Sequence, residues 1–364
     1  MFFECEALTS LDVSSFDTSN VKDMMFMFID CPELSTSIRL SGNIEAYDDA
    51  FHHAATASDA RIYVLYDGDC SRNLAEEIIG TKGENSHVYL WDAAKVTGLG
   101  LSNVSAGIKL SWDKQAADGY QIYRKASGET SYTRIKTTSS TSYMDESALS
   151  GKKYSYKVRS YIKFGNQKKY GSYSAVKSLC RLETVKLSSV SNQKSGIKLS
   201  WKAASDADGY YIYRKTASGS YKKIATIYSA STKTYTDQDV ENGTKYTYAV
   251  AVFKDKSSSA KSSAKIIYFL KTPVINDIES SSKGKLKLSW GKRENITGVE
   301  IEVSETKDFS KGITTKKVSA DKKSTTVSSL KSGKTYYARI RSYKKVNDKT
   351  YYSVYCTVKS IKVK

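Results

Sequence analysis

The hexapeptide Gly107-Ile-Lys-Leu-Ser-Trp112 recurs as Gly196-Ile-Lys-Leu-Ser-Trp201 and as Lys285-Leu-Lys-Leu-Ser-Trp290. The three tryptophans are separated by 89 residues in both steps. In each copy aliphatic residues alternate with Lys and Ser, which is the pattern of a β-strand with one buried and one solvated face. The same strand at such a regular interval predicts three similar β-domains in tandem.

Two further motifs keep the same register in every copy. A second alternating run follows each hexapeptide and starts at a glycine: Gly119, Gly209 and Gly298. A Gly-x-x-Tyr motif comes later and opens a third run, with the tyrosines Tyr154, Tyr246 and Tyr336. Several short strands and one tryptophan per unit of about 90 residues are typical of an immunoglobulin-like β-sandwich.

These motifs resemble the fibronectin type III family, in which the tyrosine of Gly-x-x-Tyr forms the tyrosine corner. The resemblance covers residues 95–364 and implies three domains, at 95–182, 183–272 and 273–364. It also implies structural roles for six residues. The tryptophans would fill the three cores and the tyrosines would make the corner hydrogen bonds: Trp112, Trp201, Trp290, Tyr154, Tyr246 and Tyr336.

A shorter repeat occupies the start of the chain. Met1-Phe2-x-x-Cys5-x-x-Leu8 recurs after 26 residues as Met27-Phe28-x-x-Cys31-x-x-Leu34, which predicts a solenoid with one cysteine inside each turn. The string LTSLDVSSFDTSNVKDMMFMF resembles the repeat of BspA-like leucine-rich-repeat surface proteins, also described as the DUF285 or Mycoplasma-lipoprotein-type repeat. We expect residues 1–94 to be the truncated end of such a solenoid with its C-terminal cap. Further repeats and an export signal are then expected upstream of Met1.

The cap is expected to be a small α/β unit. Arg61-Ile-Tyr-Val-Leu-Tyr66 and His87–Trp91 have the composition of strands, and the apolar spacing between them predicts an amphipathic helix that ends near Gly80. The predicted fold class is therefore mainly β: a short solenoid end with an α/β cap, then three tandem immunoglobulin-like sandwiches. The linkers are only a few residues long, which predicts a semi-extended rod.

Charge divides the chain at the same place. Residues 1–94 contain 5 basic and 17 acidic residues, although the whole chain carries a net charge of +19, so the remainder carries +31. Lysine on outward strand positions is one explanation of the basic part. Affinity for anionic wall polymers or glycans is the alternative. The sequence has no recognition helix or basic stripe, which argues against specific nucleic-acid binding.

No catalytic, cofactor or metal motif is found in the sequence. His52 and His53 are interpreted as structural or solvent-exposed, since adjacent residues of a helix do not share a face. Asp48 and Asp49 lack the spaced ligands and the turn glycine of a calcium loop. The cysteines are interpreted as mostly buried thiols because they form no CxxC pair: Cys5, Cys31, Cys70, Cys180 and Cys356.

One surface of the first copy is a candidate binding site. The run after Gly119 and the run opened by Tyr154 are expected to be neighbours in one sheet, and strand alternation then sorts their outward residues. These are Gln121, Tyr123 and Lys125 on one strand and Lys157, Arg159 and Tyr161 on the other. Tyrosine beside cationic side chains is suited to sugars or acidic protein surfaces. The alternative is ordinary decoration of a solvated strand.

The other two copies are predicted to differ at these positions. In the third copy Glu300 and Glu302 face Arg339 and Arg341, which predicts cross-strand ion pairs that neutralise the surface. The second copy places its tyrosines beside Thr247 and two alanines, and is predicted to be flatter and less charged. The first copy alone is therefore expected to offer tyrosine with uncompensated cations.

By resemblance, the chain is a non-catalytic, monomeric adhesion or interaction protein of the bacterial surface or of the extracellular space. The solenoid would display a binding surface, and the sandwiches would serve as spacers and as wall-contact or glycan-contact modules. Host matrix proteins, anionic wall polymers and glycans are the expected partners. No apolar run is long enough to span a membrane. The alternative is an accessory region of an extracellular glycan-degrading or wall-remodelling enzyme whose catalytic domain lies elsewhere.

Overall fold

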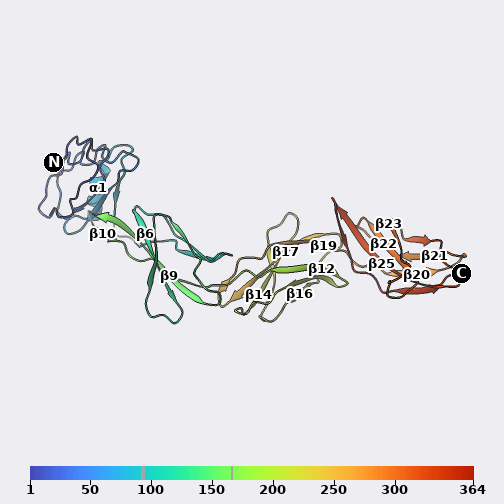
Figure 1. The fold of residues 1–364 in the computed structure, drawn as a ribbon. Helices are drawn as coiled ribbons and strands as arrows, with labels where there is room; N and C mark the ends of the chain where they lie inside the picture. The colour runs from blue at the N-terminus through green and yellow to red at the C-terminus, as the bar shows by residue number, and fades with distance from the viewer. Residues whose placement is uncertain (92–94, 165–166) are drawn as a thin grey trace. The chain divides into compact units, whose positions relative to one another are not determined.

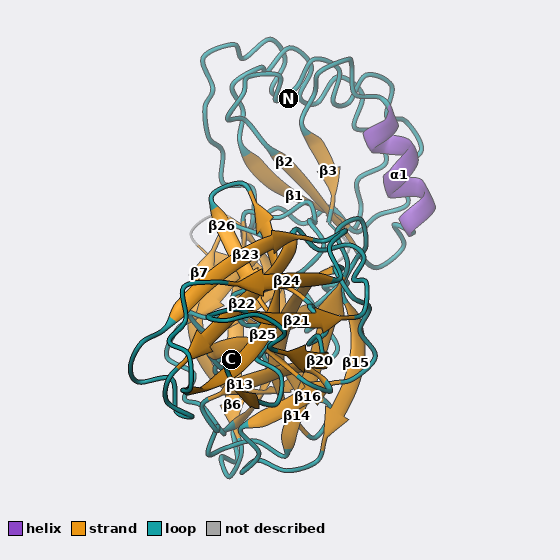
Figure 2. Cartoon of the chain, turned by 90° about the vertical axis from the view of Figure 1, so that its right-hand side faces the viewer, coloured by secondary structure: helices purple, strands orange, loops and turns teal. Residues whose placement is uncertain are grey.

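The computed structural model describes residues 1–91, 95–164 and 167–364. It divides into two compact units, Met1–Arg181 and Leu182–Lys364. Strands dominate both units, and α1 (Arg72–Gly80) is the single helix among the described residues (Figure 2). The prediction of a mainly β chain is confirmed.

The N-terminal part, residues 1–91, stacks successive chain segments in parallel (Figure 1). Its sheet contains β1 (Thr36–Leu40), β2 (Ile62–Tyr66) and β3 (Val88–Leu90), which pair in register steps of 26 residues. Single parallel bridges, such as that between Ser10 and Ser35, extend this arrangement toward the N-terminus. The register step equals the spacing of the short sequence repeat.

Stacked rings fill the interior of this part. Phe2 lies over Phe28 and Phe28 over Phe51, with ring centroids 5.7 and 5.6 Å apart. Cys31 is fully buried beside them, whereas its counterpart Cys5 is only partly buried. All five thiols are free and four are buried, in agreement with the sequence.

Helix α1 closes this part in the position expected. Ser71 caps its first turn by accepting a hydrogen bond from the backbone N–H of Leu74 at 3.1 Å. Ala75 and Ile78 form its buried side, which packs toward β2 and β3. The strands expected on either side of the helix are also present, as β2 and β3.

The first sandwich consists of two sheets over a common core. The three-stranded sheet has the order β4 (Gly100–Asn103), β5 (Ile108–Ser111), β8 (Ser142–Asp145). The larger sheet has the order β10 (Gln167–Tyr170), β9 (Lys153–Phe164), β6 (Gly119–Ala126), β7 (Thr133–Thr138), and β11 (Lys177–Cys180) also pairs with β9. Trp112 and Tyr120 meet between the sheets in an edge-to-face contact, with centroids 5.4 Å apart.

The second and third sandwiches repeat this order. The second contains β12 (Leu187–Gln193), β13 (Gly196–Trp201) and β16 (Thr234–Asp237), facing β15 (Lys222–Ile227), β14 (Gly209–Lys215), β17 (Lys245–Lys254), β18 (Ser257–Ser258) and β19 (Lys265–Tyr268). The third contains β20 (Ile275–Glu279), β21 (Leu286–Trp290) and β24 (Ser324–Val327), facing β23 (Thr314–Ser319), β22 (Gly298–Ser304), β25 (Thr335–Val346), β26 (Lys349–Tyr352) and β27 (Lys359–Lys362).

The structure explains the Gly-x-x-Tyr motif. Its glycines, Gly151, Gly243 and Gly333, have left-handed backbones with φ of 79°, 76° and 79°, which favour glycine. In each copy the tyrosine hydroxyl accepts a hydrogen bond from the backbone N–H five residues earlier, at 2.9–3.0 Å: Tyr154 from Leu149, Tyr246 from Glu241 and Tyr336 from Lys331. The motif therefore fixes the turn that leads into the long strand. The three predicted core tryptophans are buried as well.

Candidate binding face of the first sandwich

The candidate face is the outer side of the five-stranded sheet of the first sandwich. Strands β6 and β9 pair directly, so that Tyr123 lies opposite Lys157 and Gln121 opposite Arg159. Ile122 and Val158, one step along each strand, belong to the buried core. Alternation therefore directs the four opposed side chains away from the core, as the sequence predicted.

Cations and tyrosines alternate across this surface. The Lys157 ammonium lies 3.8 Å from the ring centroid of Tyr173 and 4.6 Å from that of Tyr132. The guanidinium of Arg159 lies 3.9 Å from the centroid of Tyr170 and 5.0 Å from that of Tyr173. These distances are in the range of cation–π attraction. We call the following set the cationic–aromatic face: Tyr123, Lys125, Tyr132, Lys157, Arg159, Tyr170 and Tyr173.

Three tyrosines of this face were missed by the sequence analysis. Tyr132 precedes β7, Tyr170 ends β10, and Tyr173 follows it. They come from segments at the edge of the sheet. Strand alternation identified outward residues only on the two central strands. The chain contains 28 tyrosines but 10 phenylalanines, which was the one compositional signal for such a surface.

The predicted contact residue Tyr161 and the outward-directed Gln121 are covered by their neighbours. Gln121 is 1% exposed, because its side-chain oxygen accepts hydrogen bonds from Arg159 Nη2 and from the hydroxyl of Tyr123, both at 2.9 Å. Tyr161 is 9% exposed, and the ammonium of Lys168 lies 4.2 Å from its ring centroid. The expectation that Tyr161 is open to ligand is therefore wrong, and Gln121 is not exposed either. Outward direction on a strand does not ensure exposure where long side chains fold over the sheet.

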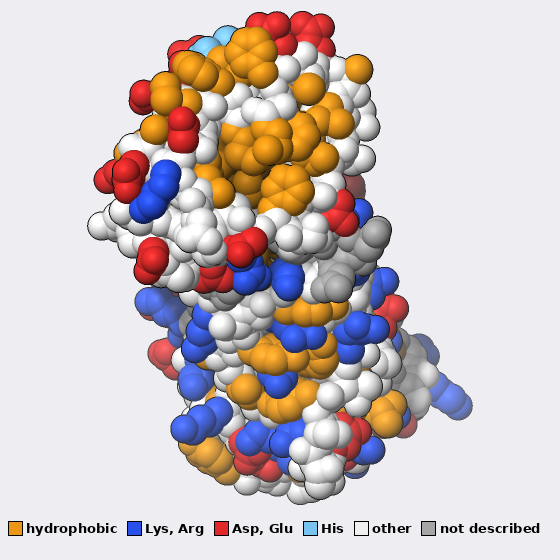
Figure 3. Space-filling model, turned by 90° about the vertical axis from the view of Figure 1, so that its left-hand side faces the viewer, with side chains coloured by type: hydrophobic (Ala, Val, Ile, Leu, Met, Phe, Trp, Pro, Cys, Tyr) orange, Lys and Arg blue, Asp and Glu red, His pale blue; other side chains and the backbone are white. Residues whose placement is uncertain are grey.

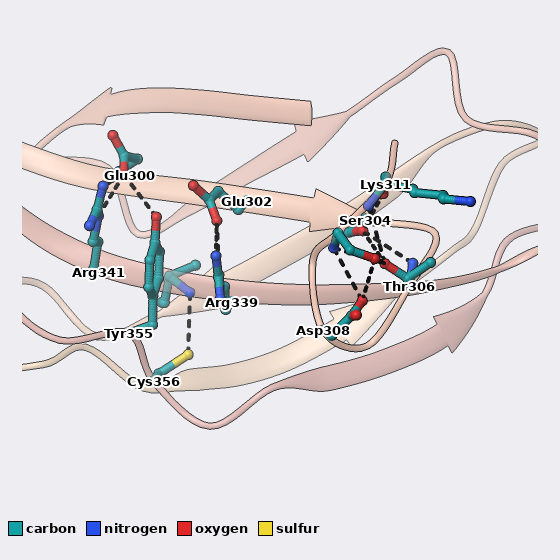
Figure 4. Close-up of polar contacts among 12 residues, drawn as sticks. Glu300, Glu302, Ser304, Thr306, Asp308, Lys311, Arg339, Arg341, Tyr355 and Cys356 are labelled. Atoms are coloured by element: carbon teal, nitrogen blue, oxygen red, sulfur yellow. Dashed lines mark hydrogen bonds and ion pairs between the residues drawn. The ribbon is translucent and has the colours of Figure 1, made fainter. Parts of the chain in front are cut away.

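The third sandwich carries the predicted ion pairs at the same register (Figure 4). Arg341 Nη2 lies 2.5 Å from Glu300 Oε1, and Arg339 Nη2 lies 2.7 Å from Glu302 Oε2. Burial alone would raise the pKa of Glu300, but its bonds with Arg341 and other neighbours outweigh burial and hold that pKa below its ordinary value. The prediction of a neutralised third surface is confirmed.

The first sandwich has cations at the same register positions, Lys157 and Arg159, without these carboxylates. Gln121 and Tyr123 occupy the register positions of Glu300 and Glu302, opposite the cations of β9. Among the residues that the structure describes, no carboxylate forms an ion pair with Lys125, Lys157 or Arg159. Their positive charge is therefore uncompensated by protein groups in the described part of the chain.

The second sandwich is more charged than predicted. Lys223 of β15 lies 4.3 Å from the ring centroid of Tyr211, and Lys261 lies 4.6 Å from that of Tyr213. The expectation of a flatter, less charged surface is wrong for this reason. The expectation that only the first copy places tyrosines beside cations is wrong as well. The difference that remains is on the central long strand, where β17 carries Ala249 and Ala251 and β9 carries Lys157 and Arg159.

Comparison with known proteins gives one partial sequence match. No family model matches the chain. The amylopullulanase of Thermoanaerobacter thermohydrosulfuricus is 47% identical over 68 residues, which are 18% of this chain. The chain spans about 4% of the length of that enzyme. This match is too short to assign a family.

Two solved structures of chicken proteins match the chain at low similarity. The FN1-FN3 domains of chicken CNTN1 match at a TM-score of 0.26 and 15% identity, over 74% of this chain and 99% of that chain. A two-domain fibronectin type III segment from chicken tenascin matches at a TM-score of 0.28 and 16% identity, over 49% and 97%. These scores are too low to support a functional inference. Among the described residues, no helix has the length and hydropathy needed to cross a membrane.

Proposed function

We propose that the chain is a non-catalytic interaction module that binds an anionic glycan through the cationic–aromatic face of its first sandwich. The observation that carries this proposal is the substitution of Gln121 and Tyr123 for the two glutamates that neutralise the third sandwich. Cations remain at these positions as Lys157 and Arg159, and within the described residues they have no carboxylate partner. A ligand with carboxylate, sulfate or phosphate groups supplies the missing charge.

The physical arrangement suits a charged sugar. The rings of Tyr170 and Tyr173 both pack near the guanidinium of Arg159, which lowers the entropy lost when the side chain binds an anion. Tyrosine rings also offer flat apolar surfaces on which the C–H face of a sugar ring can pack. The net charge of +31 outside residues 1–94 adds long-range attraction that salt screens.

Calorimetric titration of the full chain with heparin oligosaccharides at low salt tests this proposal. Tyr123→Ala with Lys157→Ala and Arg159→Ala should weaken binding by about 100-fold, if each lost contact is worth about 1 kcal/mol. Gln121→Glu with Tyr123→Glu is the sharper variant, because it installs the carboxylates of the third sandwich and removes no cation. It should weaken binding comparably.

The matched control removes cations from the opposite sheet. Lys109 on β5 and Lys114 are exposed, and Lys109→Ala with Lys114→Ala lowers the net charge by the same amount as the loss of Lys157 and Arg159. This control should retain nearly all of the affinity. Equal losses in the control and in the face variants would show non-specific attraction to a basic protein. Undiminished binding by both face variants would refute the proposed site.

We further propose that the sandwiches are fibronectin type III domains at 95–182, 183–272 and 273–364, with the second and third as spacers in a semi-extended rod. The repeated sheet order and the three tyrosine corners support this assignment. For residues 1–94 we propose a BspA-like solenoid end, supported by the parallel pairing at 26-residue steps. A place on the bacterial surface or outside the cell follows from these proposals.

A second candidate function is an accessory region of a glycan-degrading enzyme. The 68-residue match to an amylopullulanase favours it. In that case the chain should be retarded in native gels that contain pullulan or amylopectin, and added salt should leave the retardation unchanged because these glucans are neutral. Binding to heparin that salt abolishes, with no retardation by the neutral glucans, favours the first proposal.

A further inference from the structure

Two adjacent histidines and an aspartate meet at one edge of the N-terminal part. The ring centroids of His52 and His53 are 3.9 Å apart, and His53 Nδ1 lies 3.0 Å from Asp30 Oδ1. The expectation that these histidines do not share a face assumed a helix. The backbone of His53 is instead left-handed, with φ of 52°, and the two rings come together. One ligand-type atom from each of the three side chains lies within 4.8 Å of the others.

The backbone holds these side chains in register. The backbone N–H of Asp30 donates to the carbonyl of His52 at 3.0 Å, so that consecutive turns present Asp30 and the histidine pair side by side. Gly83 closes the other side. A Cβ at that position would lie 2.8 Å from Cδ2 of His53 and 3.4 Å from Cδ2 of His52. One side of the imidazole pair therefore packs close to the backbone at Gly83, while the His53 side chain remains half-exposed.

Uncompensated negative charge surrounds the cluster. Asp30 and His53 line a hollow of about 710 Å³ together with Glu4, Glu6 and Glu84. Within the described part of the chain, none of these three glutamates forms an ion pair. In Figure 3 the histidine side chains lie at the edge of the molecule with carboxylates nearby. Such a hollow attracts a cation.

We propose that Asp30, His52 and His53 bind a divalent transition-metal ion of the zinc type. Two imidazoles and one carboxylate are a common protein ligand set for zinc, with water at the fourth position. Ligand atoms on one zinc ion are roughly 3.4 Å apart for bonds of about 2.0 Å. Asp30 Oδ1 and His53 Nδ1 already lie 3.0 Å apart, and a ring nitrogen of His52 lies within 4.8 Å of both side chains' ligand atoms, so only a small side-chain adjustment is needed. Calcium is disfavoured because it takes oxygen ligands. The ion joins two consecutive turns of the N-terminal part.

The three histidines of the chain allow a test without mutation. Titration of the full chain with ZnCl₂ should shift the ring ¹⁵N signals of two imidazoles in a long-range ¹H–¹⁵N NMR spectrum. The third, His87, should stay unchanged because it packs elsewhere, with Nδ1 3.1 Å from the carbonyl of Ala57. Calorimetry in the same buffer should give one site per chain. Absence of zinc binding at millimolar concentration, or equal shifts of all three imidazoles, would overturn the proposal.

Variants then distinguish zinc binding at this site from zinc binding by other side chains. His53→Gln and Asp30→Asn should each lower the zinc affinity by about 100-fold, at the upper end of losses known for groups that support a metal site. Asp48→Asn, at an exposed acid without an ion pair in the described part of the chain, should have no effect. Cys5→Ser should have none either, which excludes binding by that partly buried thiol. Affinity that survives His53→Gln, or is lost in Cys5→Ser, contradicts the assignment.

Discussion

At the scale of single residues, the first sandwich buries a charge. Asp145 is fully buried, and its carboxylate accepts hydrogen bonds from Arg124 Nη1 at 2.9 Å and from the hydroxyls of Tyr156 and Ser147, both at 2.7 Å. Asp237, Arg214 and Tyr248 repeat this arrangement in the second sandwich. A buried ion pair of this kind contributes little in itself, but loss of one partner leaves the other charge unpaired.

Asp145→Ala is therefore expected to destabilise the first sandwich by about 3–5 kcal/mol, because Arg124 loses its buried partner. Urea unfolding of the full chain, followed by amide NMR signals of the first sandwich, measures this loss. Lys109→Ala, at an exposed position of the same domain, should change the stability by less than about 0.5 kcal/mol. A loss of similar size in both variants would mean that the ion pair is not the cause.

Acid should lower the stability of the first sandwich, because it protonates Asp145. Burial alone would raise the pKa of Asp145, but hydrogen bonds from Ser147, Tyr156 and Arg124 outweigh burial and place the pKa below its ordinary value. The folded state therefore binds this proton at lower pH than the unfolded state. The contribution of ionised Asp145 to the stability of the first sandwich is fully present above about pH 4. It is lost as the pH falls through the lower pKa that Asp145 has in the folded state. Urea midpoints between pH 5 and pH 2 should show this loss, and an Asp145→Val/Arg124→Val variant should show less of it.

At the scale of strands, the third sandwich shows how the charge can be replaced. Val327 pairs with Leu286 where Asp145 pairs with Ile108, and Val303 faces Ala338 where Arg124 faces Tyr156. The same strands with the same order are thus built without the ion pair. Apolar residues can substitute for a buried ion pair when both charges are removed together.

A double variant tests this equivalence. Arg124→Val/Asp145→Val should be more stable than Asp145→Ala by at least about 1 kcal/mol, because no unpaired charge is left in the core. Urea unfolding of the parent chain and of the two variants under one condition measures this difference. If the double variant is as unstable as the single one, the cost comes from lost packing volume and not from the charge.

A second feature recurs in the middle of the long strand, where a side chain from a neighbouring segment accepts a backbone hydrogen bond. Ser174 Oγ accepts a hydrogen bond from the backbone N–H of Val158 at 3.1 Å, and Cys356 Sγ accepts one from Ile340 at 3.3 Å in the third sandwich. Ser174→Ala should cost about 1–3 kcal/mol because it leaves a buried N–H unpaired. Cys356→Ser should cost less than about 1 kcal/mol, because the hydroxyl can make the same bond. Thermal unfolding of the two variants compares them, and a larger loss for Cys356→Ser would contradict this account.

How far the sequence predicts the structure depends on the sequence distance of the contacts. Strand alternation and the Gly-x-x-Tyr turn are local, so the strands and the tyrosine corners could be expected from residues such as Gly151 and Tyr154. The burial of Gln121 could not, because Arg159, 38 residues away, covers it. The pairing of His52 with His53 depends on a left-handed backbone that no local motif indicated.

At the scale of the whole molecule, contacts within the second unit join its two sandwiches. Lys344 Nζ donates to the carbonyls of Gly243 at 3.1 Å and of Asn295 at 2.8 Å. Tyr268 and Tyr351 pack with ring centroids 4.9 Å apart. These contacts should limit reorientation of the third sandwich relative to the second.

Lys344→Ala should loosen this junction without unfolding either sandwich. Residual dipolar couplings from the two sandwiches should fit one alignment tensor in the parent chain and two distinct tensors in the variant. Lys345→Ala is the matched control, because Lys345 is exposed and donates only its backbone N–H, to Thr297, among the contacts described. Two tensors already present in the parent chain would show that the junction is mobile despite these bonds.

The difference between the second sandwich, which buries an ion pair, and the third, which has valines at those positions, has a consequence for folding. Neighbouring domains of similar sequence can exchange strands while they fold, and tandem arrays are prone to this error. A strand of the third sandwich placed into the second would leave Asp237 or Arg214 without its partner, because Val327 and Val303 carry neither group. Such a hybrid is penalised by the same unpaired charge that makes Asp145→Ala costly. The ion pair thus disfavours strand exchange between the second and third sandwiches, whereas the first and second carry the same pair and are not distinguished by it.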